Sequence, residues 1–395
     1  MSELSEVSNQ PVAEPRSVAK RLKSLDLLRG MDLFMIVALE GVLHPLFNAV
    51  DAEWFAPVVR SLTHVEWEGF SLWDLIMPLF LFISGVSIPF AMSRYKAVSG
   101  VEKRRVYWRI VRRVLLLWLF GMVCQGNLLD LNLSCVYLYS NTLQSIAVGY
   151  LVSAIMFLHT GWNTRFVFSL VLLLLYWVVM SFVSVSGYGG GDYTPDGNLA
   201  EWVDLVVLGR FRDGANLLED GTTIFSPFYH YTWILSSGNF VVSVMSGTLV
   251  GEFLKNNRID EKKKAYLIIF AGVVLVVLGY AWGIDFPIIK KIWTSSMVVL
   301  STGYCCLLLG VLYYLVDVMR ISFPGERLFL VYGVNSIAAY MLALCVDFNS
   351  VGNSLLYGFG QYLGDFYPVL IAVSNSVIIF LILYYMYRNK IFLKV

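Results

Sequence analysis

The segment THVEWEGFSLWDLIMPLFLFISG, which begins at Thr63, carries the side chains best suited to acid–base chemistry. In an extended strand His64, Glu66 and Glu68 project the same way, and in a helix His64 and Glu68 share a face. Either conformation gives the imidazole a carboxylate neighbour. Such a neighbour fixes the tautomer and raises the basicity of the other ring nitrogen. The pattern therefore predicts a general base at His64.

The same residues allow plainer interpretations. A lone histidine at a membrane interface is more often structural than catalytic, and the acidic and aromatic surroundings of His64 are what favour catalysis. A metal site made of His64, Glu66 and Glu68 would lack the second histidine that zinc sites usually supply. We therefore expect no metal. The five cysteines lie in or near apolar runs without a CxxC pair, which indicates core residues and not a disulfide framework.

Three further carboxylates fall inside or at the ends of apolar runs. Ionisable groups in a membrane are rare and expensive, so each is a candidate functional residue. Asp32 and Glu40 are eight residues apart and would share one helix face. Asp74 lies near the outer end of the next run. Asp26 and Arg29 are spaced to pair with each other, which is as plausible as a binding role.

The composition places these residues in a membrane protein. Of the 395 residues, 58% are hydrophobic and 14% are charged, and runs of about 18 or more apolar residues indicate transmembrane helices. We predict an all-α polytopic bundle of about ten helices. A polar, disordered cytoplasmic tail at 1–23 precedes a single transmembrane domain at 24–395, without a cleaved signal peptide. The predicted spans are 25–47, 71–92, 108–127, 140–159, 166–186, 232–254, 265–284, 294–317, 327–346 and 368–387.

The placement of Lys and Arg predicts the orientation of the bundle. With the N-terminus inside, the inner loops and ends hold 24 of these cations and the outer ones hold 5. The positive-inside rule then places both termini in the cytoplasm, and we expect the inner membrane of a bacterium. The outer segment at about 187–231 is long and aromatic. Aromatic surfaces with acidic rims suit a sugar, although an interfacial aromatic belt explains most of these residues equally well.

A basic segment, RYKAVSGVEKRRVYWRIVRR, crowds the predicted cytoplasmic side. The positive-inside rule and attraction to anionic lipid account for it without any binding site. The more specific interpretation is a phosphate-binding site, because an arginine guanidinium can donate two parallel hydrogen bonds to phosphate oxygens.

The motifs SLDLLRGMDLFMIV at 24–37 and HVEWEGFSLWDLIMPLFLFISGVSI at 64–88 resemble a known family. They are similar to transmembrane acyltransferases related to heparan-α-glucosaminide N-acetyltransferase, whose bacterial members form the DUF5009 and NagX-like group. VNSIAAYML at 334–342 and YRNKIFLKV at 387–395 extend the resemblance over most of the chain. It implies acetyl transfer from cytosolic acetyl-CoA to an amino sugar or glycan outside, with His64 catalytic.

The resemblance also implies roles for individual residues. Asp74 is the aligned carboxylate, a family asparagine falls on Glu40, and Asn335 matches the NSI motif. The donor is expected at the cytoplasmic cations, and Asp32 and Asn335 are expected along a passage between the two sides. Besides acceptor and lipid, a homodimer is one possible assembly, and no nucleic acid is expected. The expected donor-binding arginines are Arg29, Arg104, Arg105, Arg109, Arg112 and Arg113.

Two other functions fit the same residues. A secondary transporter or permease for a sugar would use the intramembrane acids as proton relays. A structural subunit of an envelope assembly would tolerate their neutral replacement. For the enzyme, the sequence leaves open whether His64 acts as a general base or forms an acetyl-histidine intermediate.

Overall fold

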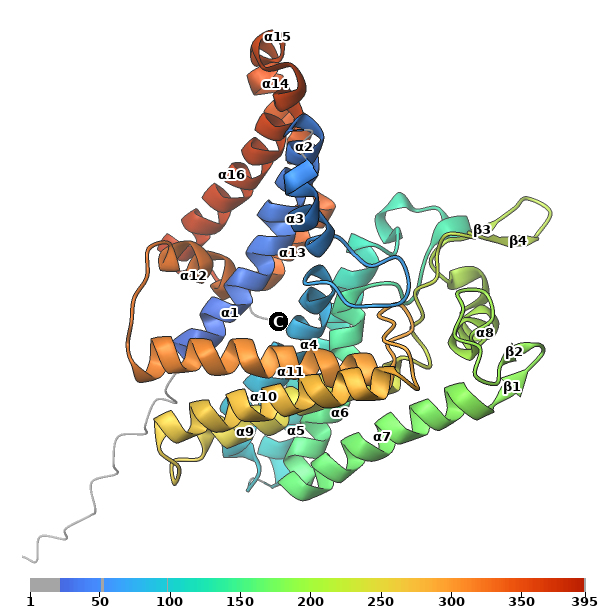
Figure 1. Ribbon diagram of the computed structural model, residues 1–395, viewed down its shortest axis with the longest axis vertical. Coiled ribbons are helices and arrows are strands. Elements are labelled where there is room, and N and C mark those ends of the chain that lie inside the picture. Colours follow the sequence, from blue (N-terminus) through green and yellow to red (C-terminus); the bar gives the residue numbers. More distant parts are fainter. Residues whose placement is uncertain (1–21, 51–52, 98, 394–395) are drawn as a thin grey trace, which may run out of the picture.

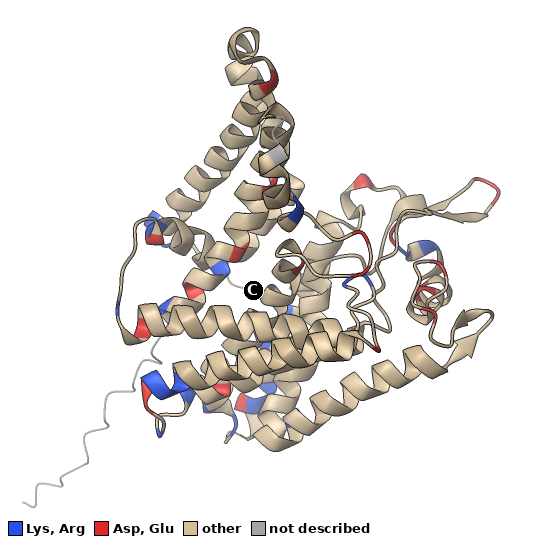
Figure 2. Cartoon of the chain, in the orientation of Figure 1, with Lys and Arg blue, Asp and Glu red and all other residues tan. Residues whose placement is uncertain are grey.

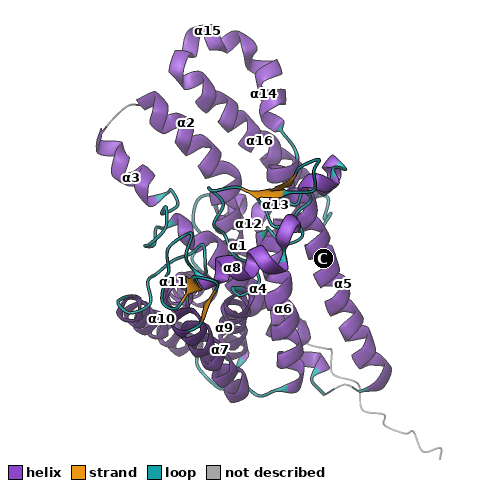
Figure 3. Cartoon of the chain, turned by 90° about the vertical axis from the view of Figure 1, so that its right-hand side faces the viewer, coloured by secondary structure: helices purple, strands orange, loops and turns teal. Residues whose placement is uncertain are grey.

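A computed structural model describes residues 22–50, 53–97 and 99–393. The predicted tail at 1–23 lies almost wholly outside these residues. The described chain is a bundle of helices with two small β-hairpins at one end (Figure 1). In Figures 1 and 3, α2, α14 and α16 extend beyond the rest of the bundle. The predicted helical class is confirmed.

The helices follow the predicted order. The first half contains α1 (Lys23–Phe34), α2 (Glu40–Val50), α3 (Ala56–Ser61), α4 (Ile76–Met92), α5 (Gly100–Cys124), α6 (Thr142–His159), α7 (Trp162–Phe182) and α8 (Leu199–Val207). The second half contains α9 (Ser237–Lys255), α10 (Glu261–Gly283), α11 (Ser295–Leu312), α12 (Glu326–Val334), α13 (Ser336–Cys345), α14 (Phe348–Leu356), α15 (Gly360–Leu363) and α16 (Tyr367–Arg388).

Length and composition identify the helices that can cross a membrane. Among the described residues, seven helical segments qualify, and the bent pair α12–α13 would be an eighth. The long helices α5 and α9 coincide with two further predicted spans but are not among the seven. The chain is thus a membrane protein, and the number of about ten spans remains a prediction. The seven are Lys23–Val50, Trp73–Tyr95, Thr142–His159, Trp162–Phe182, Glu261–Gly283, Ser295–Val318 and Phe348–Arg388.

Close glycine packing holds α4 at the centre of the bundle, against α9. A Cβ on Gly85 would lie 1.9 Å from the Val244 carbonyl oxygen, and one on Gly247 would lie 2.0 Å from the Phe82 carbonyl oxygen. Small residues let two helix backbones approach closely where the surrounding lipid supplies no hydrophobic driving force. This packing fixes α4, and the short helix that directly precedes it carries the predicted carboxylate Asp74.

A π-helical turn, η1 (Met35–Leu39), separates α1 from α2. A π turn holds more residues than an α turn, so it rotates the next helical turns around the helix axis. The expectation that Asp32 and Glu40 share a face assumed an uninterrupted α-helix. In the structure Asp32 is buried, whereas Glu40 and Ile36 line a cavity.

The single span predicted at 327–346 is broken in the structure. α12 and α13 meet at Asn335 with a bend of 82°. The Asn335 side chain binds the C-terminal segment: its Nδ2 donates to the Ile391 carbonyl at 3.1 Å, and its Oδ1 accepts from the Leu393 amide at 3.3 Å. Broken helices at membrane depth are tolerated where they are buried in protein or line a cavity.

The long segment between α7 and α9, which was predicted to face outward, folds into two hairpins and α8. Strands β1 (Ser184–Val185) and β2 (Tyr188–Gly189) form one antiparallel pair, and β3 (Ala215–Leu217) and β4 (Thr223–Phe225) form the other. Figure 2 shows Lys and Arg gathered at the turn between α9 and α10, at the opposite end of these helices from α8. The uneven distribution of Lys and Arg along the sequence is therefore also an uneven distribution in space.

Candidate active site

His64, Asp74 and Lys290 form a cluster at the N-terminal end of α4. The His64 Nδ1 lies 2.8 Å from Asp74 Oδ1. The Lys290 Nζ lies 3.3 Å from the same carboxylate oxygen and 3.1 Å from His64 Nδ1. The Asp74 side chain is 2% exposed and that of Lys290 is 10% exposed, while that of His64 is 44% exposed. The accessible His64 side chain therefore contacts a buried ion pair formed by Asp74 and Lys290.

Asp74 is held in place by the turn that precedes it. It belongs to η3 (Trp73–Leu75), and its Oδ2 accepts hydrogen bonds from the Ser71 amide at 3.0 Å and the Ser71 hydroxyl at 2.9 Å. The second oxygen, Oδ1, remains for His64 and Lys290. The carboxylate cannot turn away from the imidazole without losing its bonds to Ser71.

Two backbone contacts bring Lys290 to the His64 loop across 226 residues of sequence. The Gly69 amide donates to the Ile288 carbonyl at 2.8 Å, and Glu68 forms a β-bridge with Ile289. The loop between α10 and α11 is therefore fixed against the loop that carries His64, and Lys290 comes directly after the bridge.

The cluster suits a general base. An ionised Asp74 accepts the Nδ1 proton of a neutral imidazole, which leaves the lone pair on Nε2 free for a substrate proton. Lys290 then donates to Asp74, because a protonated Nδ1 cannot accept. Burial lowers the pKa of Lys290, and the Asp74 carboxylate opposes this shift. The Lys290 ammonium also offsets the negative charge that the Asp74 carboxylate places beside the imidazole.

A cavity of about 260 Å³ adjoins the cluster, and we name it the outer cavity after the predicted orientation. Its polar wall includes Glu40, His64, Lys290 and Gln125. Aromatic rings form much of the remaining wall. A half-open site with flat apolar faces and convergent polar groups suits a small polyol. The aromatic lining residues are Trp73, Tyr229, Tyr231, Trp233 and Tyr340.

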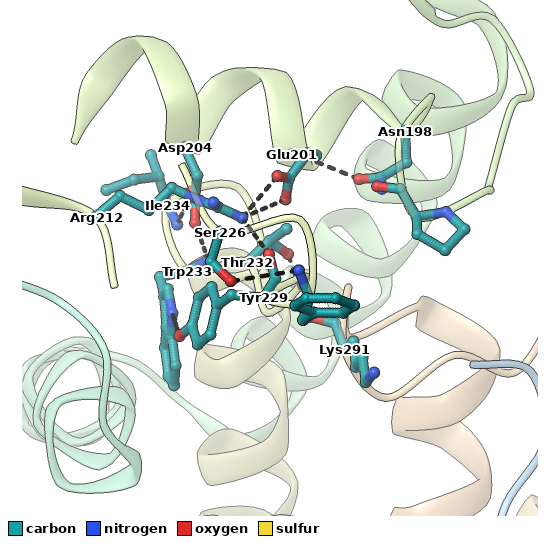
Figure 4. A network of polar contacts seen from close by, with 12 residues as sticks. Asn198, Glu201, Asp204, Arg212, Ser226, Tyr229, Thr232, Trp233, Ile234 and Lys291 are labelled. Carbon is teal, nitrogen blue, oxygen red and sulfur yellow. Dashed lines mark hydrogen bonds and ion pairs between the residues drawn. The ribbon is translucent and has the colours of Figure 1, made fainter. Parts of the chain in front are cut away.

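Helix α8 positions the aromatic wall of this cavity (Figure 4). Asp204 accepts from the Trp233 amide at 2.7 Å and the Ile234 amide at 2.9 Å. Burial raises the pKa of Asp204 to about 6, although both amides favour the charged form. These bonds fasten the segment after Tyr231 to α8.

An ion pair of the same helix holds the preceding residues. The Arg212 guanidinium donates to both oxygens of Glu201, at 2.6 and 2.7 Å, and to the Tyr229 carbonyl at 3.0 Å. Asn198 caps α8 by accepting from the Glu201 amide at 2.8 Å. The long outer loop is therefore an ordered support for the cavity wall.

A second cavity of about 320 Å³, which we name the inner cavity after the predicted orientation, lies farther along α4 and α6. Arg29 and Arg113 line it, together with Ser84, Ser87 and Ser336. The Arg29 guanidinium donates to the Ser87 hydroxyl at 3.0 Å. The Arg113 Nε is buried and has no hydrogen-bond partner within the described part of the chain. Because Ser336 begins α13, the positive end of that helix dipole also faces this cavity.

Thr142 and Tyr340 line both cavities. Tyr340 is buried, and its hydroxyl donates to Asn141 Oδ1 at 3.5 Å. Thr142 is the first residue of α6, and Asn141 is its N-cap. The arginine-lined cavity and the histidine-lined cavity therefore adjoin each other and share these two residues in their walls.

The structure separates the predicted site residues into groups. Asp74 contacts His64, whereas Glu66 and Glu68 are exposed and make no hydrogen bond to His64 within the described chain. Glu40 lines the outer cavity.

Asp32 and Asn335 line neither cavity, and Asn335 adjoins the inner one through Val334 and Ser336. Of the predicted arginines, Arg29 and Arg113 line the inner cavity, while Arg104, Arg105, Arg109 and Arg112 are exposed on α5.

Two residues of the site, Lys290 and Tyr340, were absent from the predicted set. Lys290 is one of only five cations on the predicted outer side, and this exception to the positive-inside pattern was a signal for function. Tyr340 lies within the NSI-containing segment at 334–342, but nothing local marks it as part of a cavity wall.

Comparison with known proteins agrees with the predicted resemblance. Residues 21–207 match the family model described as heparan-alpha-glucosaminide N-acetyltransferase, catalytic. The chain is 24% identical to the mouse heparan-alpha-glucosaminide N-acetyltransferase over 437 aligned positions, which cover 96% of this chain and 61% of the relative. It is 25% identical to the human protein of the same name, with 95% and 60% covered. The chain thus spans about three-fifths of the length of these relatives, and the predicted resemblance is confirmed.

Proposed function

We propose that this chain, which is related to the heparan-alpha-glucosaminide N-acetyltransferases, transfers an acetyl group from acetyl-CoA to an amino sugar or glycan across a membrane. One observation carries the proposal. A cavity lined by His64 and a cavity lined by two arginines adjoin each other at Thr142 and Tyr340. A donor and an acceptor that enter from opposite sides would meet at this point.

The inner cavity suits the donor. Acetyl-CoA carries phosphates at one end and a thin pantetheine arm that ends in the thioester. Arg29, Arg113 and the N-terminus of α13 present positive charge to this cavity, and guanidinium groups and helix N-termini both bind phosphate oxygens. The arm would then pass between Thr142 and Tyr340 and bring the thioester toward His64.

The outer cavity suits the acceptor. Tyr231 and Trp233 offer flat apolar faces, and Glu40 offers a carboxylate. Aromatic faces pack against the C–H faces of a pyranose, and a carboxylate binds a hydroxyl or an ammonium group. The cavity of about 260 Å³ has room for one sugar ring, so a glycan acceptor would present its terminal residue.

The cluster would carry the proton during transfer. The His64 Nε2 removes a proton from the acceptor nitrogen or oxygen while that atom attacks the thioester carbonyl. Asp74 stabilises the imidazolium that forms, and the proton then passes to the departing CoA thiolate. General-base assistance of this kind contributes about 10²–10⁴-fold. Transfer through an acetyl-histidine would instead require His64 itself to attack the thioester.

The charge distribution supports the proposed sidedness. The turn between α9 and α10 is rich in lysine, and α8 and the hairpins lie at the opposite end of the bundle (Figure 2). In a bacterial inner membrane, the positive-inside rule would place the arginine-lined cavity toward the cytoplasm, where acetyl-CoA is made. The transporter alternative loses part of its support, because Asp32, the most deeply placed acid, lines neither cavity.

Acetyl transfer in vesicles tests the proposal. Purified protein is reconstituted, acetyl-CoA labelled in the acetyl group is supplied on one side, and amino sugars on the other. We expect labelled sugar to accumulate, and we expect His64→Ala to abolish it. Glu66→Gln serves as the matched control, because Glu66 lies in the same loop and makes no hydrogen bond to His64 in the described chain. Full activity in His64→Ala, or sugar uptake without acetylation, would refute the proposal.

A further inference from the structure

Two cysteines lie together at the rim of the outer cavity. Cys124 ends α5 and Cys345 ends α13, and their Sγ atoms are 3.2 Å apart although 221 residues separate them in the sequence. Cys124 is half-buried and Cys345 is exposed. Their chain neighbours Gln125 and Leu344 both line the outer cavity.

The other three cysteines have different surroundings. Cys305 and Cys306 are buried within α11. Cys135 lies in the loop after α5, and its thiol donates to the Asn132 carbonyl of its own turn at 3.7 Å. Among the described thiols, only Cys124 and Cys345 form a hydrogen bond with another cysteine.

We propose that Cys124 and Cys345 are a disulfide-forming pair that fastens α13 to α5 beside the acceptor cavity. This inference rests on the proposed orientation, in which the ends of both helices face the extracytoplasmic side. That side is oxidising, and disulfides persist there. An S–S bond is about 2.05 Å long, so the sulfur atoms have only about 1 Å to close.

The oxidant is a disulfide-bearing thiol oxidant, either a protein or a small molecule. The exposed Cys345 thiolate attacks one sulfur of the oxidant, whose S–S bond breaks and releases a first thiolate. The Cys124 thiolate then attacks Cys345 Sγ in the mixed disulfide and releases the second thiolate. The two cysteine protons end on the two released thiols, and two electrons pass from the cysteines to the oxidant.

The pair has a consequence for the passage between the cavities. α13 carries Tyr340, begins at the 82° bend, and ends at Cys345. With only ten residues, it depends on contacts at both ends for its position. A covalent link at Cys345 fixes the end beyond Tyr340, so the oxidised chain holds Tyr340 against Thr142 more firmly than the reduced chain does.

Differential alkylation tests the pair without any acyl donor. The protein in membranes is treated with N-ethylmaleimide, unfolded, reduced, and treated with a mass-distinct alkylating reagent. A second sample is first incubated with oxidised glutathione. We expect Cys124 and Cys345 to carry the second reagent, and we expect a linked 124–345 peptide before reduction. Cys135→Ser should keep the link, and Cys124→Ser should abolish it.

The outcome is separate from that of the proposed function. N-ethylmaleimide on both cysteines after incubation with oxidised glutathione would overturn the pairing, whatever the transferase assay shows. A midpoint of thermal unfolding that falls by several degrees on reduction in wild type, but not in Cys124→Ser, would support a fastening role. Equal midpoints in the oxidised and reduced wild-type protein would refute that role, and acetyl transfer without the link would leave the proposed function intact.

Discussion

The Asp74 carboxylate lies 2.8 Å from the Nδ1 of His64, and the Ser71 turn holds it there. The two residues are ten positions apart in the sequence, yet Asp74 begins a membrane helix and His64 lies in the loop before it. A rigid helix therefore sets the position of the acid, and the acid in turn sets the tautomer and direction of the imidazole.

Removing the charge of Asp74 should cost more activity than removing that of Glu66 or Glu68. In Asp74→Asn the imidazolium formed during transfer loses its stabilising carboxylate, so we expect kcat to fall by about 10²-fold or more. Glu66→Gln and Glu68→Gln should stay within about threefold, because both side chains are exposed and neither forms a hydrogen bond to His64 within the described chain. Steady-state acetyl transfer in vesicles measures all three. A larger loss in Glu66→Gln than in Asp74→Asn would contradict the assignment.

Lys290 should set the pH range in which the base works. In Lys290→Met the full negative charge of Asp74 acts on His64, which favours the imidazolium. A base must be neutral to act, so the acidic limb of the pH–rate profile should move to higher pH, and kcat/KM near neutral pH should fall by about tenfold. Lys290→Arg should restore much of the wild-type profile.

A neighbouring lysine supplies the control for this change. Lys291→Met removes a cation that lies 5.9 Å from the Trp67 and Tyr231 ring centroids, and it should leave the acidic limb in place. Thermal unfolding should be recorded in parallel, because breaking a buried ion pair destabilises the fold by itself. An unmoved profile in a folded Lys290→Met protein would exclude this role.

The arginines of the inner cavity should govern the affinity for the donor. Arg113→Ala and Arg29→Ala each remove a cation from this cavity, and we expect the KM for acetyl-CoA to rise by about tenfold with a smaller change in kcat. Arg104→Ala and Arg105→Ala are matched controls, since both are exposed on α5. Equal effects of all four substitutions would indicate general attraction by a basic surface and not a defined site.

The support beneath the cavity wall should depend on pH through Asp204. Its pKa rises from 3.8 to about 6 on burial, so the folded chain binds an extra proton between these values. The free energy of unfolding should therefore fall as the pH rises from about 4 to about 6, by about 3 kcal/mol at most from this group. In Asp204→Asn this part of the slope should vanish.

Thermal unfolding between pH 4.5 and 7.5, monitored by tryptophan fluorescence, measures this difference. Glu219→Gln replaces an exposed acid in the turn between β3 and β4, and it controls for general effects of losing an acid. An identical pH dependence in wild type and Asp204→Asn would show that Asp204 ionises in the fold as it does in the unfolded chain.

The local features of this chain can be predicted from its amino-acid sequence. Long apolar runs specify membrane helices. Backbone N–H and C=O groups without hydrogen-bond partners are too costly in lipid, and apolar side chains are stable there. The distribution of Lys and Arg predicted the orientation of the bundle, because cytoplasmic loops carry an excess of these cations. The segment around His64 was recognisable because its polar side chains recur at short spacings within an apolar context.

Contacts between residues far apart in the sequence became visible only in the folded chain. Lys290 reaches His64 across 226 residues because a β-bridge joins their loops, and Cys345 reaches Cys124 because α12–α13 bends at Asn335. The choice of Asp74 over Glu66 and Glu68 as the partner of His64 came from the turn before α4. Such contacts depend on how whole helices pack, and helix packing is set by many weak contacts at once that no short stretch of sequence contains.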